Sequence, residues 1–370
     1  MLQGEIYEDL IRQTWLHLLS VNETLRSVII WRNIEHPVHV IFKNIEFPYQ
    51  VVDLSKENNS FEAANLMIDK EWECKIDIQK NSYRIMLCKM SQRKYLMILS
   101  THHIFTDGWS NMILLNEFYT TYHQLYYEKP LNDSNKAPLK QYIQFVNQNT
   151  KIKVINFWKH YLKGYCEKKS ITGMYALYKS EVLSYKLNKI MMNQLNEFVL
   201  KHNITTAILF YAAWGYLQMK MQKVCDTVFG IIVSGREASF KGIEDLVGLF
   251  IKSLPIRVQW KEHDTAIQFM ERIRSDFLAI ESNQQINFAE VMTDLGLNSM
   301  NLFNTAVVIQ KYTLNKSQLE NRKEQVKLKL YNSKYETNLD ITVGIKDLPD
   351  EFIEIEFSYN KLKYSHEDIN

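Results

Sequence analysis

Two adjacent histidines, His102 and His103, stand before Asp107 and Gly108 in the segment His-His-Ile-Phe-Thr-Asp-Gly-Trp-Ser. A neutral imidazole titrates near neutral pH, so it can accept a proton from an amine or donate a hydrogen bond to a developing oxyanion. A carboxylate is a weaker base, and we expect Asp107 to hold the turn. Gly108 is expected to permit a backbone angle or a close approach that a Cβ atom would block. No serine or cysteine stands in a nucleophile-elbow or Cys/His context, which favours direct transfer between two bound substrates.

The segment lies between an apolar run and a helical pattern. Residues 95–101 have the length and composition of a buried strand. The following residues predict a helix with one apolar face, formed by Met112, Leu115, Phe118, Tyr119 and Tyr122. A strand-turn-helix unit can present an imidazole rigidly, which favours a catalytic interpretation. The alternative is a structural histidine pair followed by a helix with Asp107 as its N-cap.

Composition excludes several classes of function. The 370 residues carry 44 basic and 42 acidic side chains, and this near balance gives no support for nucleic-acid binding. The N-terminus lacks a signal-peptide pattern and no apolar stretch reaches about 18 residues, so we expect a cytoplasmic protein that does not enter a membrane. The four cysteines lie far apart without zinc-ligand spacing, which predicts free thiols and no metal site.

Strand and helix patterns interleave in both halves of the chain. This predicts an α/β fold with antiparallel hairpins rather than a strict βαβ repeat. A polar, turn-rich segment at residues 163–173 separates the halves. We therefore expect an N-terminal domain over residues 1–165, with the histidine motif, and a C-terminal domain over residues 166–370.

In the second half, Ser234, Gly235 and Arg236 follow a predicted strand over residues 227–233. An arginine at such a place is usually a surface charge. Its planar guanidinium is also the natural partner of a buried carboxylate, and the sequence alone leaves both interpretations open. Trp109, beside the histidine motif, can line a substrate channel.

Together these segments resemble a condensation domain of nonribosomal peptide synthetases, and the resemblance covers nearly the whole chain. The family's central signature is a doubled histidine followed after three residues by Asp-Gly, and it matches residues 102–108. Other acyltransferases share a single-histidine version, so the ordered series of segments is the more specific signal. The further matching segments are Asn22–Ser27, Tyr142–Phe145, Phe157–Leu162, Phe229–Arg236, Gly242–Glu244, Val247–Phe250, Asn283–Gln285 and Phe303–Thr305.

The resemblance implies two chloramphenicol-acetyltransferase-like lobes in a V-shaped arrangement, with the active site at their junction. It also implies amide bond formation, in which the amine of a carrier-bound aminoacyl thioester attacks a donor acyl or peptidyl thioester on a second carrier. The implied partners are upstream and downstream peptidyl carrier proteins and adenylation domains of the same synthetase. The chain itself would bind no cofactor, because the carriers supply the 4'-phosphopantetheine arms.

The same resemblance implies roles for individual residues. His103 would act as the base, or position the amine and stabilise the tetrahedral state, with His102, Asp107 and Gly108 beside it. Arg236 would be the ionic partner of Asp107 across the junction of the two lobes, and Arg26 would give structural support. The substrate channel would include Trp109, Ser110, Ser234 and Asn304.

The chain also departs from the family pattern. It lacks the usual helix and motif before Leu2 and the usual last helix, which predicts truncation at both ends, and Lys252 replaces a usual asparagine. Two rival functions share the fold: an epimerisation domain, which usually carries its tryptophan after the serine, and a non-catalytic carrier-binding or recruitment module, which typically loses the second histidine or the glycine. The order Trp109–Ser110 and the intact motif favour condensation, and the histidine pair excludes a cyclisation domain.

Overall fold

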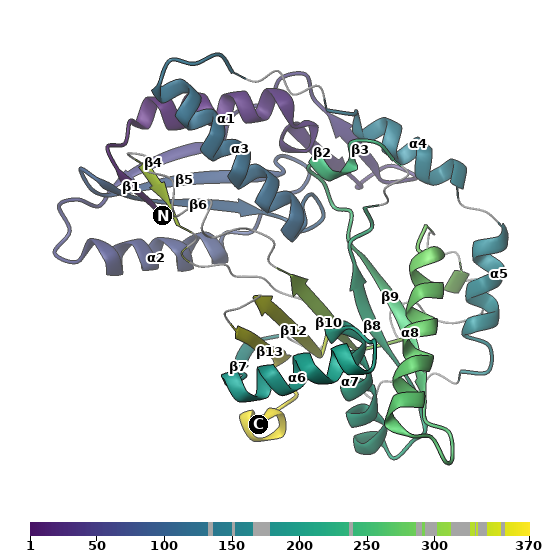
Figure 1. Ribbon diagram of the computed structural model, residues 1–370. Coiled ribbons are helices and arrows are strands. Elements are labelled where there is room, and N and C mark those ends of the chain that lie inside the picture. Colours follow the sequence, from purple (N-terminus) through teal and green to yellow (C-terminus); the bar gives the residue numbers. More distant parts are fainter. Residues whose placement is uncertain are drawn as a thin grey trace. The chain divides into compact units, whose positions relative to one another are not determined.

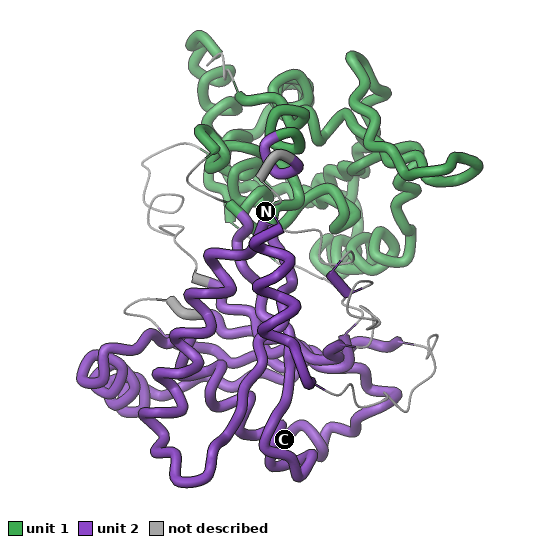
Figure 2. Tube along the Cα trace, turned by 90° about the vertical axis from the view of Figure 1, so that its right-hand side faces the viewer, with its two compact units in different colours: residues 1–144, 236–250, 314–335 green, residues 145–235, 251–313, 336–370 purple. Residues whose placement is uncertain are grey.

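The computed structural model describes residues 1–131, 136–149, 152–165, 178–236, 240–285, 291–292, 302–311, 326–329, 331, 339–348 and 352–370. The chain forms two compact units, which Figure 2 shows in different colours. The first unit comprises residues 1–144, 236–250 and 314–335, and the second comprises residues 145–235, 251–313 and 336–370.

This division differs from the single boundary after residue 165 that the sequence predicted. Two segments from the second half of the chain belong to the first unit, because their apolar side chains complete its core. Val247 is buried in that core, and so are Val326 and Leu328 of strand β11 (Val326–Leu328). Hydrophobic periodicity indicates which face of an element is buried but not which core receives it, so the pattern could not predict this exchange.

A five-stranded sheet with helices on both faces forms the centre of the first unit (Figure 1). Alternate residues of one strand explain the two covered faces, since successive side chains point to opposite sides. Tyr83, Ile85 and Leu87 share a core with helices α1 and α3, whereas Met86 and Cys88 pack against helix α2. The strand order is β11, β1 (Leu2–Gly4), β6 (Lys94–Thr101), β5 (Tyr83–Ser91) and β4 (Tyr49–Asp53), and the helices are α1 (Glu8–Val21), α2 (Ser60–Glu73) and α3 (Gly108–Tyr126).

A smaller group of elements extends the first unit beyond this sheet. The chain leaves α1 through a 3₁₀ helix, η1 (Glu23–Arg26), and forms a hairpin of β2 (Ser27–Ile30) and β3 (Val38–Ile41). A separate apolar cluster joins the start of α4 (Leu139–Asn149) to the segment 240–250, which contains the 3₁₀ helix η2 (Ile243–Asp245). This cluster holds Leu139, Ile243, Leu246 and Phe250, so the segment packs within the first unit.

The second unit contains a six-stranded mixed sheet. Strand β10 (Thr305–Lys311) runs parallel to both of its neighbours, β8 and β12, while the other pairs are antiparallel. Gly215 lets helix α7 approach this sheet closely, because a Cβ atom there would lie 2.5 Å from Val258 Cγ2. The α/β class predicted from the sequence is confirmed in both units. The remaining described elements are β7 (Ser180–Lys186), β13 (Phe352–Asn360), β12 (Ile341–Leu348), β8 (Asp226–Val233), β9 (Lys252–Gln259), α5 (Ile152–Tyr161), α6 (Lys189–Lys201), α7 (Thr206–Gln222), α8 (Ala266–Ser282) and α11 (His366–Ile369).

Candidate active site

The histidine motif lies in the first unit between β6 and α3. Strand β6 ends at Thr101 and α3 begins at Gly108, so residues 102–107 form the connecting turn. A hydrogen bond from the Phe105 N–H to the His102 oxygen (3.0 Å) closes this turn. The Phe105 side chain is buried while both histidines are exposed. The predicted strand-turn-helix unit is therefore present, and it presents the imidazoles to solvent.

His103 places its Nδ1 atom 2.7 Å from the backbone oxygen of Thr106. A carbonyl oxygen only accepts hydrogen bonds, so in the neutral ring Nδ1 carries the proton and Nε2 carries the lone pair. The same hydrogen bond restrains the ring on its turn. The geometry supplies a proton acceptor in one tautomer, which is what a general base requires.

His102 has a different set of interactions. Its Nδ1 atom accepts a hydrogen bond from the Ile104 N–H (3.1 Å). Partial burial and the neighbouring His103 lower the pKa of His102. Since only an unprotonated Nδ1 can accept from Ile104, the lowered pKa preserves this bond at neutral pH. These contacts fit the predicted supporting role.

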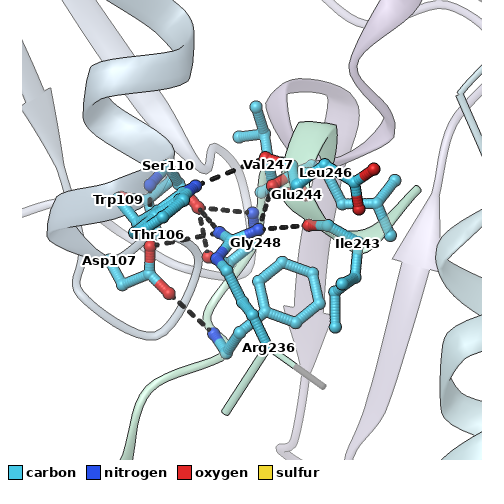
Figure 3. Close-up of polar contacts among 12 residues, drawn as sticks. Thr106, Asp107, Trp109, Ser110, Arg236, Ile243, Glu244, Leu246, Val247 and Gly248 are labelled. Carbon is cyan, nitrogen blue, oxygen red and sulfur yellow. Dashed lines mark hydrogen bonds and ion pairs between the residues drawn. The ribbon is translucent and has the colours of Figure 1, made fainter. Parts of the chain in front are cut away.

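Asp107 is fully buried and is the N-cap of α3. Its Oδ1 atom accepts from the Ser110 N–H (2.8 Å), and its Oδ2 atom accepts from the Phe250 N–H (2.9 Å). Arg236 Nη2 lies 3.4 Å from Oδ1, so the predicted ion pair is confirmed (Figure 3). Both residues belong to the first unit, whereas the prediction placed the pair across the junction of the two lobes. Asp107 is thus both a helix cap and the partner of a buried cation.

Arg236 has closer partners than Asp107. Its Nη1 atom donates to the backbone oxygens of Ile243 (2.5 Å) and Leu246 (2.9 Å), and its Nη2 atom donates to Ser110 Oγ (2.9 Å). Burial lowers the pKa of the guanidinium, and the carboxylate of Asp107 opposes this shift. Arg236 therefore fixes the segment 243–246 beside the turn, and it is not a surface charge.

Ser110 is fully buried, which corrects the prediction that it lines the substrate channel. Its hydroxyl donates to the Gly248 oxygen (2.6 Å) and accepts from the Gly248 N–H (3.0 Å) as well as from Arg236. The physical reason is its place on α3, since residues 110, 114 and 118 share the buried face. Gly248 is needed beside it, because a Cβ atom there would lie 2.7 Å from the Phe250 ring.

Gly108 and Trp109 are exposed at the start of α3. Trp109 is 49% exposed and donates from Nε1 to the Glu244 oxygen (3.3 Å), so much of its ring is accessible, and its role in a channel stays a prediction. Two of the reasons that glycine could be needed at position 108, a positive φ and close packing against the protein, do not apply. Its φ is not positive, and a Cβ atom would meet no heavy atom of the described residues within 4 Å. A side chain here would project into open space.

Three other predicted residues lie outside this cluster. Arg26 donates to the backbone oxygens of Leu19 (3.1 Å) and Phe42 (2.7 Å), which are contacts of a structural residue. Ser234 follows β8 and is exposed in the second unit. Asn304 is also in the second unit, where its Nδ2 atom donates to Asp340 Oδ2 (2.7 Å). The channel roles of Ser234 and Asn304 stay predictions.

Sequence reasoning missed the backbone donors that hold the motif. The N–H groups of Gly248 and Phe250 bind Ser110 and Asp107, and both come from the segment Val247–Phe250. That segment matches a family motif, but read alone it has the appearance of an edge strand. A backbone donor leaves no mark on the type of its residue, so only the motif match could have pointed to it.

The described residues lack a candidate metal site and a candidate membrane-spanning helix. They contain no group of three or more His, Cys, Asp or Glu side chains placed to hold a metal ion. None of their helices is long and apolar enough to cross a membrane.

Solved structures with a similar fold come from nonribosomal peptide synthesis. The chain is similar to one from the complex of the X-domain and OxyB from teicoplanin biosynthesis, with a TM-score of 0.82 and 14% identity over 100% of this chain and 83% of that one. A starter condensation domain of rhizomide synthetase gives a TM-score of 0.80 and 15% identity over 100% and 84%. A four-domain nonribosomal peptide synthetase bound to AMP and glycine gives a TM-score of 0.82 and 16% identity, over 97% of this chain and 29% of that one. These similarities confirm the predicted fold class.

The sequence relatives are much longer proteins, and the chain spans between 6% and 15% of their length. Gramicidin S synthase 2 of Brevibacillus brevis is 26% identical over 374 residues, which cover 98% of this chain and 8% of that protein. Bacitracin synthase 3 of Bacillus licheniformis is 25% identical over 379 residues, which cover 100% and 6%. The family model described as Condensation domain matches residues 1–370. The chain belongs to the condensation-domain family of nonribosomal peptide synthetases.

Proposed function

We propose that this domain forms an amide bond between two carrier-bound substrates. The donor is an acyl or peptidyl thioester, and the acceptor is an aminoacyl thioester with a free amine. The observation that carries the proposal is the tautomer of His103 that its hydrogen bond selects. Its Nδ1–H is committed to the Thr106 oxygen, so Nε2 of this exposed side chain carries the lone pair that can accept a proton from the amine.

The reaction requires one proton to move through the site. The amine nitrogen attacks the thioester carbon, a C–N bond forms, and the carbonyl oxygen becomes an oxyanion. His103 Nε2 takes the proton that the nitrogen loses. The C–S bond then breaks, and the leaving thiolate receives that proton, so the imidazole returns to its neutral form. A weaker form of the proposal is that Nε2 only accepts a hydrogen bond and positions the amine.

Two observations support condensation over an epimerisation domain or a non-catalytic module. The first is that the motif retains both His103 and Gly108. The second is the order Trp109–Ser110, which agrees with the environments of the two side chains. The serine is buried against Gly248, whereas the preceding tryptophan is half exposed. We also propose that carrier proteins and adenylation domains of the same synthetase are the partners, in the cytoplasm, with the 4'-phosphopantetheine arms arriving as parts of the substrates.

The test uses purified carriers loaded with a donor and an acceptor. Mass spectrometry of the intact carriers should show the joined acyl or peptidyl product on the acceptor and a free thiol on the donor. A single loaded carrier in deuterated water should show no exchange of the α-proton. Exchange without joining would assign an epimerisation domain. Carrier binding with neither reaction would assign a non-catalytic module.

A further inference from the structure

Buried hydroxyl groups hold the peptide group between Val247 and Gly248 from two directions. Thr24 Oγ1 donates to the Val247 carbonyl oxygen (2.5 Å), and the Gly248 N–H donates to Ser110 Oγ (3.0 Å). The carbonyl and the N–H belong to one planar peptide unit, so the two bonds fix its orientation together. Thr24 is 1% exposed and Ser110 is 0% exposed, which keeps water from competing for either bond.

Thr24 is itself held in place by contacts that do not involve the histidine turn. It lies in η1, where Ser27 Oγ donates to the Thr24 oxygen (2.8 Å). Leu25 is buried in the main core of the unit, and Arg26 joins η1 to the end of α1. The hydroxyl therefore comes from a rigid element, and it can act as a fixed point for the peptide group.

We infer that Thr24 is a positioning residue of the active site that acts through this peptide group. When the Thr24 hydroxyl is removed, the buried Val247 oxygen loses this donor, and the peptide plane can rotate towards a different hydrogen-bond donor. Rotation disturbs the hydrogen bonds between Gly248 and Ser110. The Ser110 hydroxyl also accepts a hydrogen bond from Arg236, and the Ser110 N–H donates to the capping carboxylate of Asp107. The start of α3 and the adjoining turn with His103 then lose part of their support.

Three variants separate positioning from ordinary packing. Thr24→Val keeps the shape and removes the hydroxyl, whereas Thr24→Ser keeps the hydroxyl. Thr14→Val is a matched control, because Thr14 is also fully buried and its Oγ1 donates to a carbonyl oxygen, that of Leu10 (2.7 Å), within α1 of the same unit. Hydrogen exchange of the Gly248 amide should be at least about 10-fold faster in Thr24→Val and nearly unchanged in Thr24→Ser and Thr14→Val.

The catalytic readout rests on the proposed function. With both carriers saturating, Thr24→Val should lower the single-turnover rate of amide formation by about 10-fold or more, with KM for the acceptor carrier changed less than about 3-fold, and Thr24→Ser should restore most of the rate. Equal Gly248 exchange in Thr24→Val and Thr14→Val would overturn the inference, as would a serine variant no better than valine. If the wild type forms no amide, the proposed function fails, and the exchange measurement alone decides the role of Thr24.

Discussion

Arg236→Ala and Asp107→Ala should each destabilise the first unit, and the double variant should lose less than the sum. Breaking a buried ion pair on one side costs roughly 3–5 kcal/mol. Arg236→Ala leaves Asp107 with two backbone donors, the N–H groups of Ser110 and Phe250, so we expect a loss near the lower limit, about 3 kcal/mol. Asp107→Ala also removes a helix cap, worth about 1 kcal/mol, and leaves the Phe250 N–H unpaired, so we expect about 5 kcal/mol.

The double variant removes both charges, and we expect a coupling energy of about 2 kcal/mol between the two sites. The quantity to measure is the free energy of opening of α3, from native-state hydrogen exchange of its amides in the wild type, the two single variants and the double variant. This measurement reports on the first unit alone, whereas denaturant unfolding of a chain with two units need not be two-state.

Asp226 and Arg257 form a matched control in the second unit. Their closest atoms are 2.6 Å apart, closer than in the Asp107–Arg236 pair, but the Asp226 side chain is 33% exposed. If burial dominates over distance, the coupling here should be at most about 1 kcal/mol, measured from the amides of β8. The prediction fails if the double variant loses the sum of the two single-variant losses to within about 0.5 kcal/mol. It also fails if the coupling energy of Asp226 and Arg257 exceeds that of Asp107 and Arg236.

Two further variants test the site and the second unit. Gly108→Ala should fold at least as stably as the wild type, because alanine favours helices over glycine by about 1 kcal/mol and its Cβ atom would meet no clash. The rate of amide formation should fall if a substrate occupies the space beside Gly108. A lower melting temperature of the variant would contradict the stability prediction. Burial raises the pKa of Asp276 from 3.8 to about 6, so the unfolded carboxyl ionises before the folded one and stability falls as pH rises from 3.8 to about 6. Asp276→Asn removes this loss. Allowing for the partial exposure of the side chain, the variant should gain about 1–2 kcal/mol in free energy of unfolding at pH 7.5 and almost nothing at pH 4. An equal gain at both pH values would contradict the raised pKa of Asp276.

The strand-turn-helix unit was predictable because its determinants are local. The apolar run, the turn and the cap at Asp107 are neighbours in sequence. The helical face was less well predicted, since the structure buries Ser110 and Leu114 where the pattern favoured Met112 and Leu115. The channel role of Ser110 came from the family resemblance, and its place on the buried face of α3 overrides that role.

Long-range contacts were predictable only where the family resemblance supplied them. Asp107 and Arg236 are 129 residues apart, and no local pattern relates them. The resemblance includes the segments that contain Thr24 and Val247, but it did not relate the two residues, because their hydrogen bond ends on a backbone atom that any residue type provides. The return of residues 236–250 to the first unit was missed for a similar reason, since it depends on which core accepts Val247 and its neighbours.

The most direct test of the account is the rate of amide formation by His103→Ala, measured in a single turnover with loaded donor and acceptor carriers. His36→Ala is a suitable control, because His36 is an exposed histidine of the same unit, with a side chain 84% exposed. We predict a rate lower by roughly 10²–10⁴-fold in His103→Ala, with unchanged carrier binding and melting temperature, and a wild-type rate in His36→Ala. An undiminished rate of product formation in His103→Ala would contradict the central claim.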